Sequence, residues 1–154
     1  MAGWQAQTDR PRYKLGKLKT RLKCLQINLQ HSRTATDNLT KIINEEENDI
    51  VCVQEPYNIG NKAVGLRRSC AVFVSGAGRK RAAIAIKNKR IDTLLLTQLS
   101  EDTVVETRVD KASLILVSMY FDINRPMDID LQKMQEILTH AKGTGTIFAI
   151  DSNA

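Results

Sequence analysis

Four predicted strands of this chain carry polar side chains at or near their carboxyl ends. Asn28 lies near the end of the first strand, Glu55 follows the second, and Tyr120 lies near the end of a later one. The last predicted strand leads into Asp151 and Asn153. A carboxylate can hold a divalent cation or activate water, and amide and phenol groups donate hydrogen bonds to developing negative charge. The set is suited to the cleavage of a phosphodiester.

Each of these side chains also has an ordinary structural explanation when it is taken alone. An Asn at a strand end usually forms a turn, a Glu before Pro is usually exposed, and Asp151 could begin an Asx turn. Their order along the chain and their common place at strand ends favour a functional site, because function in α/β sheets concentrates at such ends.

The apolar periodicity predicts the elements that position these residues. Residues 23–30 alternate with a period of two, which predicts a strand, expected at the centre of a sheet. A short amphipathic helix follows, with Thr36 or Asp37 as its cap. Residues 49–56 form a continuous β-branched run typical of a buried strand, ended by Pro56, which donates no ladder hydrogen bond. This order predicts a βαβ unit.

The rest of the chain predicts an α/β protein with one domain. Several short runs rich in Val, Ile and Leu lie between residues 70 and 121 and predict consecutive antiparallel strands. Residues 129–142 show helical spacing of apolar side chains, and residues 147–154 return to a strand. Helices therefore lie at both ends of a largely antiparallel, mixed arrangement of strands. A length of 154 residues is sufficient for a single hydrophobic core.

The positive charge of the chain is confined to its N-terminal segment. Residues 1–23 carry seven basic side chains and one acid, which accounts for the whole net charge of +6. We expect residues 1–22 to form a disordered arm and residues 23–154 the folded domain. Such an arm binds a polyanion, acts as a nuclear import signal or is a solvated tail. No signal peptide or membrane span is evident, so we expect an intracellular protein, located in the nucleus, without membrane contact.

The cysteines indicate a reducing compartment, and we assign them no chemical role. Cys24, Cys52 and Cys70 are odd in number and lack the CxxC spacing of a metal site. Because two of them lie inside apolar runs, we expect buried, reduced thiols.

The order of the polar strand ends resembles that of the exonuclease, endonuclease and phosphatase superfamily, whose fold is shared by DNase I and the apurinic endonucleases. The resemblance covers residues 23–154 and rests on "QINLQHS", "DIVCVQEPY", "LVSMYF" and "AIDSNA". The wording of "LQINLQHSR", "VCVQEPY", "RAAIAI" and "AIDSNA" is similar to the endonuclease domain that begins the pol polyprotein of non-LTR retrotransposons, particularly site-specific insect elements.

This resemblance implies a DNase I-like four-layered α/β sandwich and a metal-dependent nuclease. It makes Glu55 the ligand of Mg²⁺, or alternatively Mn²⁺, and Asp151 the group that orients or deprotonates the attacking water. Asn28 and Asn153 would donate to phosphate oxygens and fix neighbouring acids, and Tyr120 would donate to the scissile phosphate. The expected activity is a nick in target DNA that leaves a 3′ hydroxyl, the primer for a reverse transcriptase in the same polyprotein.

Basic residues near the strand ends are candidates for contacts to DNA. His31 follows the first strand, where a phosphate contact is an open alternative, whereas His140 is expected to cap a helix. Arg79, Lys80 and Arg81 form a basic turn that either binds phosphate or is a solvated hairpin tip.

The chain departs from the family in two ways. Gln30 stands where many apurinic endonucleases have an acid, and the family's later Asp and its Ser-Asp-His segment have no counterpart before Ala154. We therefore expect a C-terminally incomplete domain that is nearly inactive alone, with an apolar edge on its last strand that a remaining endonuclease segment would cover. Two alternatives stay open: an apurinic repair endonuclease or other phosphodiesterase, and a nucleic-acid-binding domain without catalysis.

Overall fold

The computed structural model of the chain describes residues 21–96, 102–109 and 111–152. In chain order the elements are β1 (Cys24–Asn28), α1 (Arg33–Glu45), β2 (Ile50–Gln54), β3 (Asn58–Ile59), β4 (Lys62–Ala63), β5 (Ala71–Phe73), β6 (Ala82–Ile86), β7 (Asp92–Leu95), β8 (Thr103–Val109), β9 (Ala112–Tyr120), α2 (Met127–Ala141) and β10 (Gly145–Asp151). Most of the predicted basic arm lies outside the described residues.

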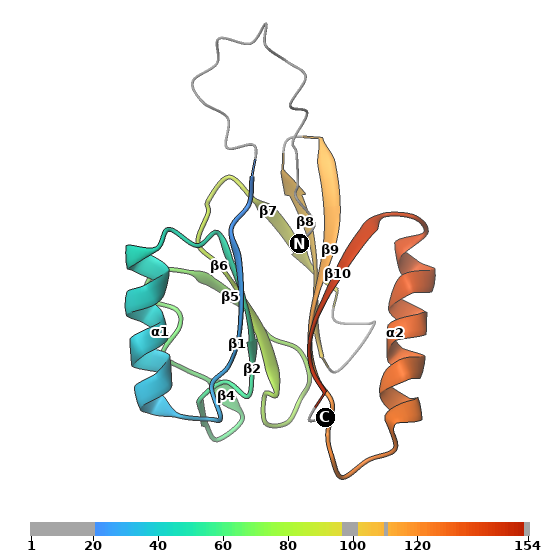
Figure 1. The fold of residues 1–154 in the computed structure, drawn as a ribbon, viewed down its shortest axis with the longest axis horizontal. Helices are drawn as coiled ribbons and strands as arrows, with labels where there is room; N and C mark the ends of the chain where they lie inside the picture. Colours follow the sequence, from blue (N-terminus) through green and yellow to red (C-terminus); the bar gives the residue numbers. More distant parts are fainter. Residues whose placement is uncertain (1–20, 97–101, 110, 153–154) are drawn as a thin grey trace, which may run out of the picture.

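Two sheets pack face to face, and one helix covers the outer side of each. The first sheet has the order β1-β2-β6-β5, and the second has the order β10-β9-β8-β7. Figure 1 shows α1 and α2 on opposite sides, with both sheets between them. The predicted four-layered α/β sandwich is therefore confirmed, and β6 and β7, predicted as sequential strands, lie in different sheets.

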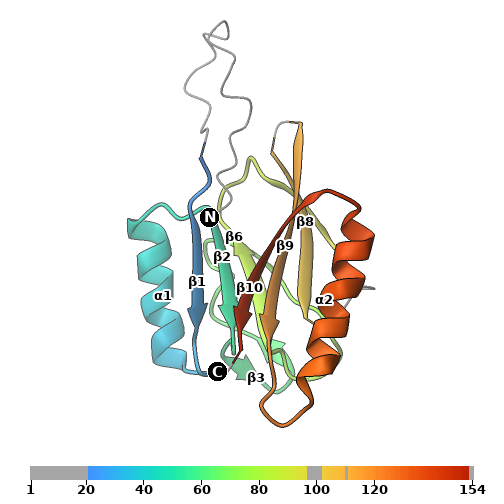
Figure 2. The same ribbon diagram turned by 45° about the vertical axis from the view of Figure 1, so that its right-hand side comes forward.

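Each sheet contains one parallel pair of strands joined through a helix. β1 pairs with β2 in parallel and β9 pairs with β10 in parallel, because α1 and α2 make the long crossover that parallel strands require. The other pairs within the two sheets are antiparallel. Figure 2 shows the arrowheads of β1, β2, β9 and β10 pointing the same way. The carboxyl ends of both parallel pairs therefore lie at one end of the sandwich.

The sandwich has three apolar layers. Residues such as Ile84 and Leu116 fill the space between the two sheets, and Leu22 packs in the same cluster although it falls at the end of the predicted arm. Leu39 and Ile43 of α1 pack on the first sheet, and the second sheet packs against Ile137 and other residues of α2. Burial of these faces supplies the main driving force for folding.

Two predictions about the first βαβ unit are wrong. β1 lies at the edge of its sheet and not at the centre, because β2 and β6, buried along their whole length, occupy the interior. α1 begins at Arg33, before the predicted caps Thr36 and Asp37, because the side chain of Ser32 accepts a hydrogen bond from the Ala35 amide at 3.1 Å. Thr36 is instead buried under Gly65.

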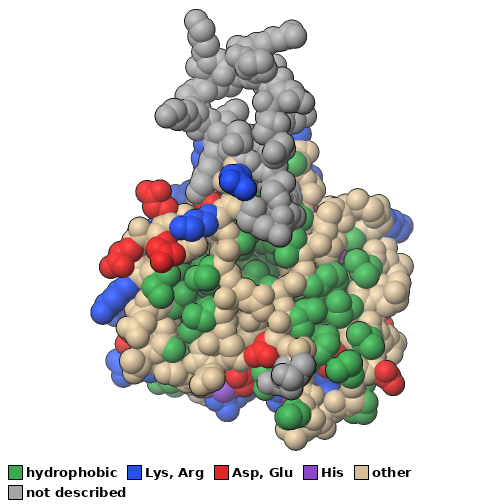
Figure 3. Space-filling view, viewed as in Figure 1, with side chains coloured by type: hydrophobic (Ala, Val, Ile, Leu, Met, Phe, Trp, Pro, Cys, Tyr) green, Lys and Arg blue, Asp and Glu red, His purple; other side chains and the backbone are tan. Residues whose placement is uncertain are grey.

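The second sheet also ends on an edge strand. Within the described residues β10 pairs with β9 alone, so its other side is the exposed edge that was predicted for the last strand. Hydrophobic side chains lie exposed between α1 and β1 and between β10 and α2 on the face that carries β1 and β10 (Figure 3). Neither α1 nor α2 has the length and hydropathy needed to cross a membrane.

The cysteines differ in exposure. Cys52 is buried as predicted, and burial raises the pKa of its thiol to about 12, so it stays protonated at neutral pH. Cys24 is exposed, contrary to prediction, because β1 lies at the sheet edge.

Candidate active site

The predicted polar residues meet where the two parallel pairs of strands end. Asn28 ends β1, and Glu55 comes directly after β2. Tyr120 ends β9 and is the register partner of Asp151, which ends β10. Because both sheets present their carboxyl ends here, side chains separated by more than a hundred positions in sequence come into contact.

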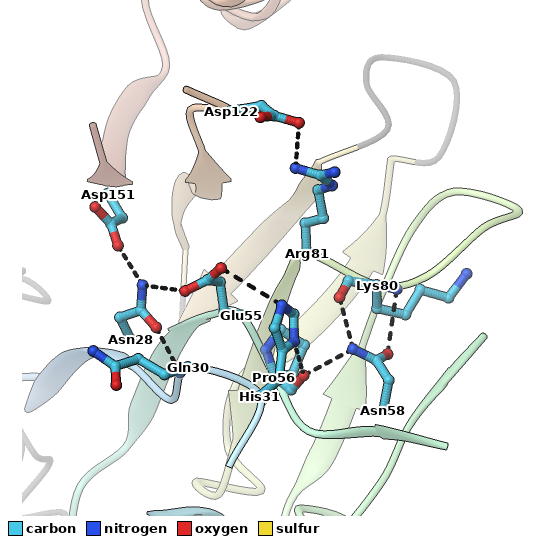
Figure 4. A network of polar contacts seen from close by, with 10 residues as sticks. All are labelled: Asn28, Gln30, His31, Glu55, Pro56, Asn58, Lys80, Arg81, Asp122 and Asp151. Atoms are coloured by element: carbon cyan, nitrogen blue, oxygen red, sulfur yellow. Dashed lines mark hydrogen bonds and ion pairs between the residues drawn. The ribbon is translucent and has the colours of Figure 1, made fainter. Parts of the chain in front are cut away.

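Asn28 joins the two acids of the site. Its Nδ2 donates to Glu55 Oε2 at 2.9 Å and also to Asp151 Oδ2 (Figure 4). Its Oδ1 accepts from the Gln30 amide at 2.7 Å, which fixes the side-chain amide with its two donors toward the carboxylates. A neutral amide between two negative groups reduces their repulsion and holds them at a fixed separation. Asn28 therefore links Glu55, which follows a strand of the first sheet, to Asp151, which ends a strand of the second.

The backbone of Glu55 is strained. Its φ is +46°, whereas its position before Pro56 predicts an extended backbone. Two hydrogen bonds hold this conformation: the Glu55 amide donates to the Arg81 carbonyl at 2.7 Å, and the His31 amide donates to the Glu55 carbonyl at 2.8 Å. A left-handed residue other than glycine costs about 1–3 kcal/mol and persists where surrounding structure over-determines it. This left-handed backbone conformation sets the direction of the Glu55 carboxylate.

His31 lies against the other oxygen of Glu55. Its Nδ1 is 2.9 Å from the Pro56 carbonyl, which only accepts, so Nδ1 carries a proton. Its Nε2 is 3.5 Å from Glu55 Oε1, an ion pair when the ring is protonated. Asn28 and His31 thus contact the two different oxygens of the Glu55 carboxylate. The phosphate contact of His31 stays a prediction.

A buried polar bridge positions the strand that leads to Glu55. Gln54 Nε2 donates to Ser118 Oγ at 2.9 Å and to the Ala149 carbonyl at 3.0 Å, so β2 is joined to β9 and β10. Ser118 Oγ donates in turn to the Val53 carbonyl at 2.9 Å. This bridge crosses the apolar space between the sheets immediately beneath the site, and it fixes how the two carboxyl ends face one another.

We expect replacement of Gln54 by Leu to lower the free energy of unfolding by about 1–3 kcal/mol, because a buried carbonyl and a hydroxyl lose their partner. The matched control is Gln135→Leu, since Gln135 donates to Thr139 Oγ1 at 3.5 Å on the exposed face of α2, and its replacement should cost less than about 1 kcal/mol. Urea unfolding of both variants measures the difference. Equal losses would show that the buried bridge has no special role.

Arg81 lies beside the acids of the site. Its guanidinium donates to Asp122 Oδ2 at 2.6 Å, and its Cζ lies 5.6 Å from the centre of the Tyr120 ring. The amide of Asn124, foremost, and then the charge of Arg81 hold the pKa of Asp122 below its usual range. Asp122 therefore remains a charged partner for Arg81 well into the acid range, which keeps the guanidinium over the ring.

The basic side chains of the turn have different partners. Lys80 Nζ donates to the Gly76 carbonyl in its own loop, and the Lys80 backbone is clamped by Asn58 at 2.9 and 3.2 Å. Arg79 lines a pocket together with Arg81. Of the three predicted DNA contacts in this turn, the structure places Arg81 beside the acids and turns the ammonium of Lys80 back to its own loop.

The structure thus brings together most of the predicted set. Asn28, Glu55, Asp151 and His31 are in one polar network, with Tyr120 beside them as the strand neighbour of Asp151. Asn153 lies outside the described residues. Sequence reasoning missed the following residues: Gln54, Ser118 and Asp122. A polar Gln at the end of the β-branched run before Glu55 was a usable signal; Ser118 and Asp122 carried none.

The donor set fits a Mg²⁺ ion. Among the described residues, no group of three or more His, Cys, Asp and Glu side chains could hold a metal by itself. Glu55 and Asp151 instead offer hard carboxylate oxygens, and Asp151 lines an open pocket of about 410 Å³ with Asn28 and Gln54. Mg²⁺ is characteristically bound by one or two carboxylates, several waters and substrate phosphates. Glu55 would hold such an ion.

Two sheets between two helices, with an Asn, a Glu and an Asp at one end, define the DNase I-like fold of the endonuclease, exonuclease and phosphatase superfamily. Comparison with solved structures finds the endonuclease domain of TRAS1, a telomere-specific non-LTR retrotransposon, at 30% identity and a TM-score of 0.77, covering 86% of this chain and 59% of that one. The AP endonuclease LMAP from Leishmania major has the same fold at 17% identity and a TM-score of 0.58, covering 86% of this chain and 55% of that one.

A sequence relative agrees with these structures. A 115 kDa protein of the type-1 retrotransposable element R1DM of Drosophila melanogaster is 26% identical over 132 residues, which is 84% of this chain and 13% of that protein. No family model matches the chain. The predicted resemblance to the superfamily and to retrotransposon endonucleases is confirmed, and the chain spans 59% of the TRAS1 domain.

Proposed function

We propose that the chain is part of a Mg²⁺-dependent DNA endonuclease of a non-LTR retrotransposon. The observation that carries this proposal is the Asn28 amide, which donates to both Glu55 and Asp151 at the carboxyl ends of the two parallel strand pairs. The similarity to the TRAS1 endonuclease domain supports it. In this proposal the enzyme nicks double-stranded target DNA, and a reverse transcriptase of the same polyprotein extends the 3′ hydroxyl. The protein would work in the nucleus, where its target lies.

The residues of the site divide the reaction between them. When bound, Mg²⁺ supplies positive charge that neutralises the phosphoryl oxygens. Asp151 accepts the proton of the attacking water at a carboxylate oxygen, and Asn28 keeps that carboxylate apart from Glu55. Tyr120 donates its hydroxyl to the scissile phosphate, and the Arg81 guanidinium adds positive charge beside it. Manganese would suit the same oxygen donors.

A repair endonuclease remains the second candidate, because the fold also matches an AP endonuclease. That match, at 17% identity, concerns the fold alone, whereas TRAS1 and R1DM both come from retrotransposons. A catalytically silent DNA-binding domain would need no fixed pair of acids. The charged pair beneath a shared amide therefore favours a nuclease.

Substrate choice separates these candidates. The protein encoded by the whole reading frame should nick intact plasmid in the presence of Mg²⁺, and an abasic site in a duplex oligonucleotide should raise its rate less than about tenfold. Incision confined to the abasic site would establish the repair enzyme, and DNA binding without any cleavage would establish the silent domain.

A further inference from the structure

A second, basic pocket adjoins the candidate active site. It has a volume of about 420 Å³ and is bounded by the loop from Ser75 to Arg81 and by residues at the start of β8, after β9 and on α2. We call this the basic pocket; its charged lining residues are Arg79, Arg81, Asp102, Asp122, Arg125 and Lys133. Arg81 belongs to both places, because its guanidinium also lies over the Tyr120 ring. A ligand in this pocket would therefore lie beside the reacting phosphate.

The charge of the basic pocket favours an anion. Four cationic and two carboxylate side chains line it, a net charge of +2, which Asp130 behind Arg125 reduces to +1. The acids are held by cations of the pocket, Asp122 by Arg81 at 2.6 Å and Asp102 by Lys133 at 3.6 Å. Within the described part of the chain, Arg79 makes no ion pair. Its charge is available to a ligand.

Ser75 adds an unsatisfied donor. Its side chain is 6% exposed, and its hydroxyl has no hydrogen-bond partner among the described residues. A buried hydroxyl without a partner costs free energy, so such groups call for a partner that is not part of the protein. Gly76 follows with a φ of +84°, which turns the loop back at this point. None of the amides from Gly76 to Arg79 donates to a backbone carbonyl of the described residues.

We propose that the basic pocket binds a backbone phosphate of the nucleic-acid strand, adjacent to the phosphate that is cleaved. This inference rests on the proposed function. Guanidinium groups, a hydroxyl and loop amides are together the donors that recognise phosphate oxygens. Each strand of duplex DNA carries one phosphate for about every 3.4 Å of helix axis, so a polyanion placed at Asp151 and Glu55 presents further phosphates to neighbouring cations. The pocket then sets the register of the strand on the enzyme.

Binding of DNA to the 154-residue chain tests this site without any need for cleavage. Fluorescence anisotropy of a labelled duplex, in EDTA and over a range of salt, should show about tenfold weaker binding for Arg79→Ala. The slope of log affinity against log salt should fall by about 0.9, as expected for one lost phosphate contact. The control is Arg90→Ala, an exposed arginine beyond β6 at the opposite end of the sheets, which should leave the slope unchanged.

Ser75→Ala separates a ligand contact from a structural one. Because the hydroxyl has no partner in the protein, the variant should unfold at an unchanged or higher urea concentration, yet bind the duplex about threefold more weakly. Nuclear magnetic resonance then identifies the source of the phosphate. The Gly76 and Gly78 amides should shift with micromolar duplex and only with millimolar inorganic phosphate.

Three results would overturn the proposal: unchanged affinity and slope in Arg79→Ala, glycine amides that respond to inorganic phosphate but not to duplex, or no binding of duplex by the wild-type chain. The first or second result, together with intact plasmid nicking, would reject the basic pocket as a phosphate site and leave the proposed function standing. Loss of binding in Arg79→Ala, without nicking by the whole protein, removes the endonuclease and keeps the pocket.

Discussion

Replacing Glu55 by Gln should lower Mg²⁺-dependent nicking by about a thousandfold or more, while the affinity for DNA changes little. Gln has nearly the same shape, and its side-chain oxygen can still accept from Asn28, as Glu55 Oε2 does at 2.9 Å. What the variant loses is the negative charge that holds a cation, and a bound cation contributes several kcal/mol to phosphoryl transfer. No phosphate contact is lost, so binding through cationic side chains remains.

The measurement is plasmid nicking by the protein of the whole reading frame, with DNA affinity determined in parallel. Glu45→Gln is the matched control, because Glu45 is exposed at the far end of α1 and the same charge is removed. Its rate should equal that of the wild type. If Glu55→Gln keeps a tenth of the wild-type rate, Glu55 is not the metal ligand.

Asp151→Asn should slow nicking by about 10² to 10⁴, the usual contribution of a general base. Asn cannot take a proton from water, but it fills the same space at the end of β10 and can still accept from Asn28. The residual rate should rise about tenfold for each unit of pH, because hydroxide replaces the missing base. Such a profile belongs to proton transfer and would not follow from loosened structure.

Two measurements, urea unfolding and the pH profile of the rate, test the assignment of Asp151 as the general base. Urea unfolding should show a loss of less than about 1.5 kcal/mol, since one charge-assisted hydrogen bond becomes a neutral one. A larger loss of stability together with a flat pH profile would make Asp151 a structural residue, held by Asn28 for the sake of the fold.

The sequence predicted the site where local pattern decides position. Glu55 and Asp151 stand at the carboxyl ends of runs whose apolar residues require burial, so a polar side chain at the end of each run must lie where the strand leaves the core. Within each βαβ unit the parallel strands share the direction of their carboxyl ends, and the packing of the two sheets then brings both pairs of ends together. Fold class and the main catalytic candidates follow from these local signals.

Features that depend on distant partners were not predictable in this way. The left-handed backbone of Glu55 contradicts its local preference before proline and exists because Arg81 and His31 hydrogen-bond to its peptide groups. The edge position of β1 depends on which strand pairs beside β2, and that partner, β6, is far away in the sequence. Gln54 and Ser118 recognise one another only after the sheets pack.

The basic turn shows the same limit on a smaller scale. Arg79, Lys80 and Arg81 are adjacent in sequence, and their pattern predicts either a phosphate-binding turn or a solvated hairpin tip. The ammonium of Lys80 donates a hydrogen bond to the Gly76 carbonyl, whereas the guanidinium of Arg81 donates to Asp122, which lies 41 positions away. Long-range charge pairing decides the direction of each side chain, and charge density alone does not show it.

The most direct test of the proposed endonuclease is the chemistry of the DNA ends that it makes. Supercoiled plasmid is incubated with the protein of the whole reading frame, with Mg²⁺ or with EDTA, and a DNA polymerase then extends any nick with labelled nucleotides. A hydrolase that uses Glu55 and Asp151 should give open circles only with Mg²⁺, and the polymerase should extend them without prior phosphatase treatment. Nicking in EDTA, or ends that accept nucleotides only after a 3′ phosphate is removed, would contradict the assignment.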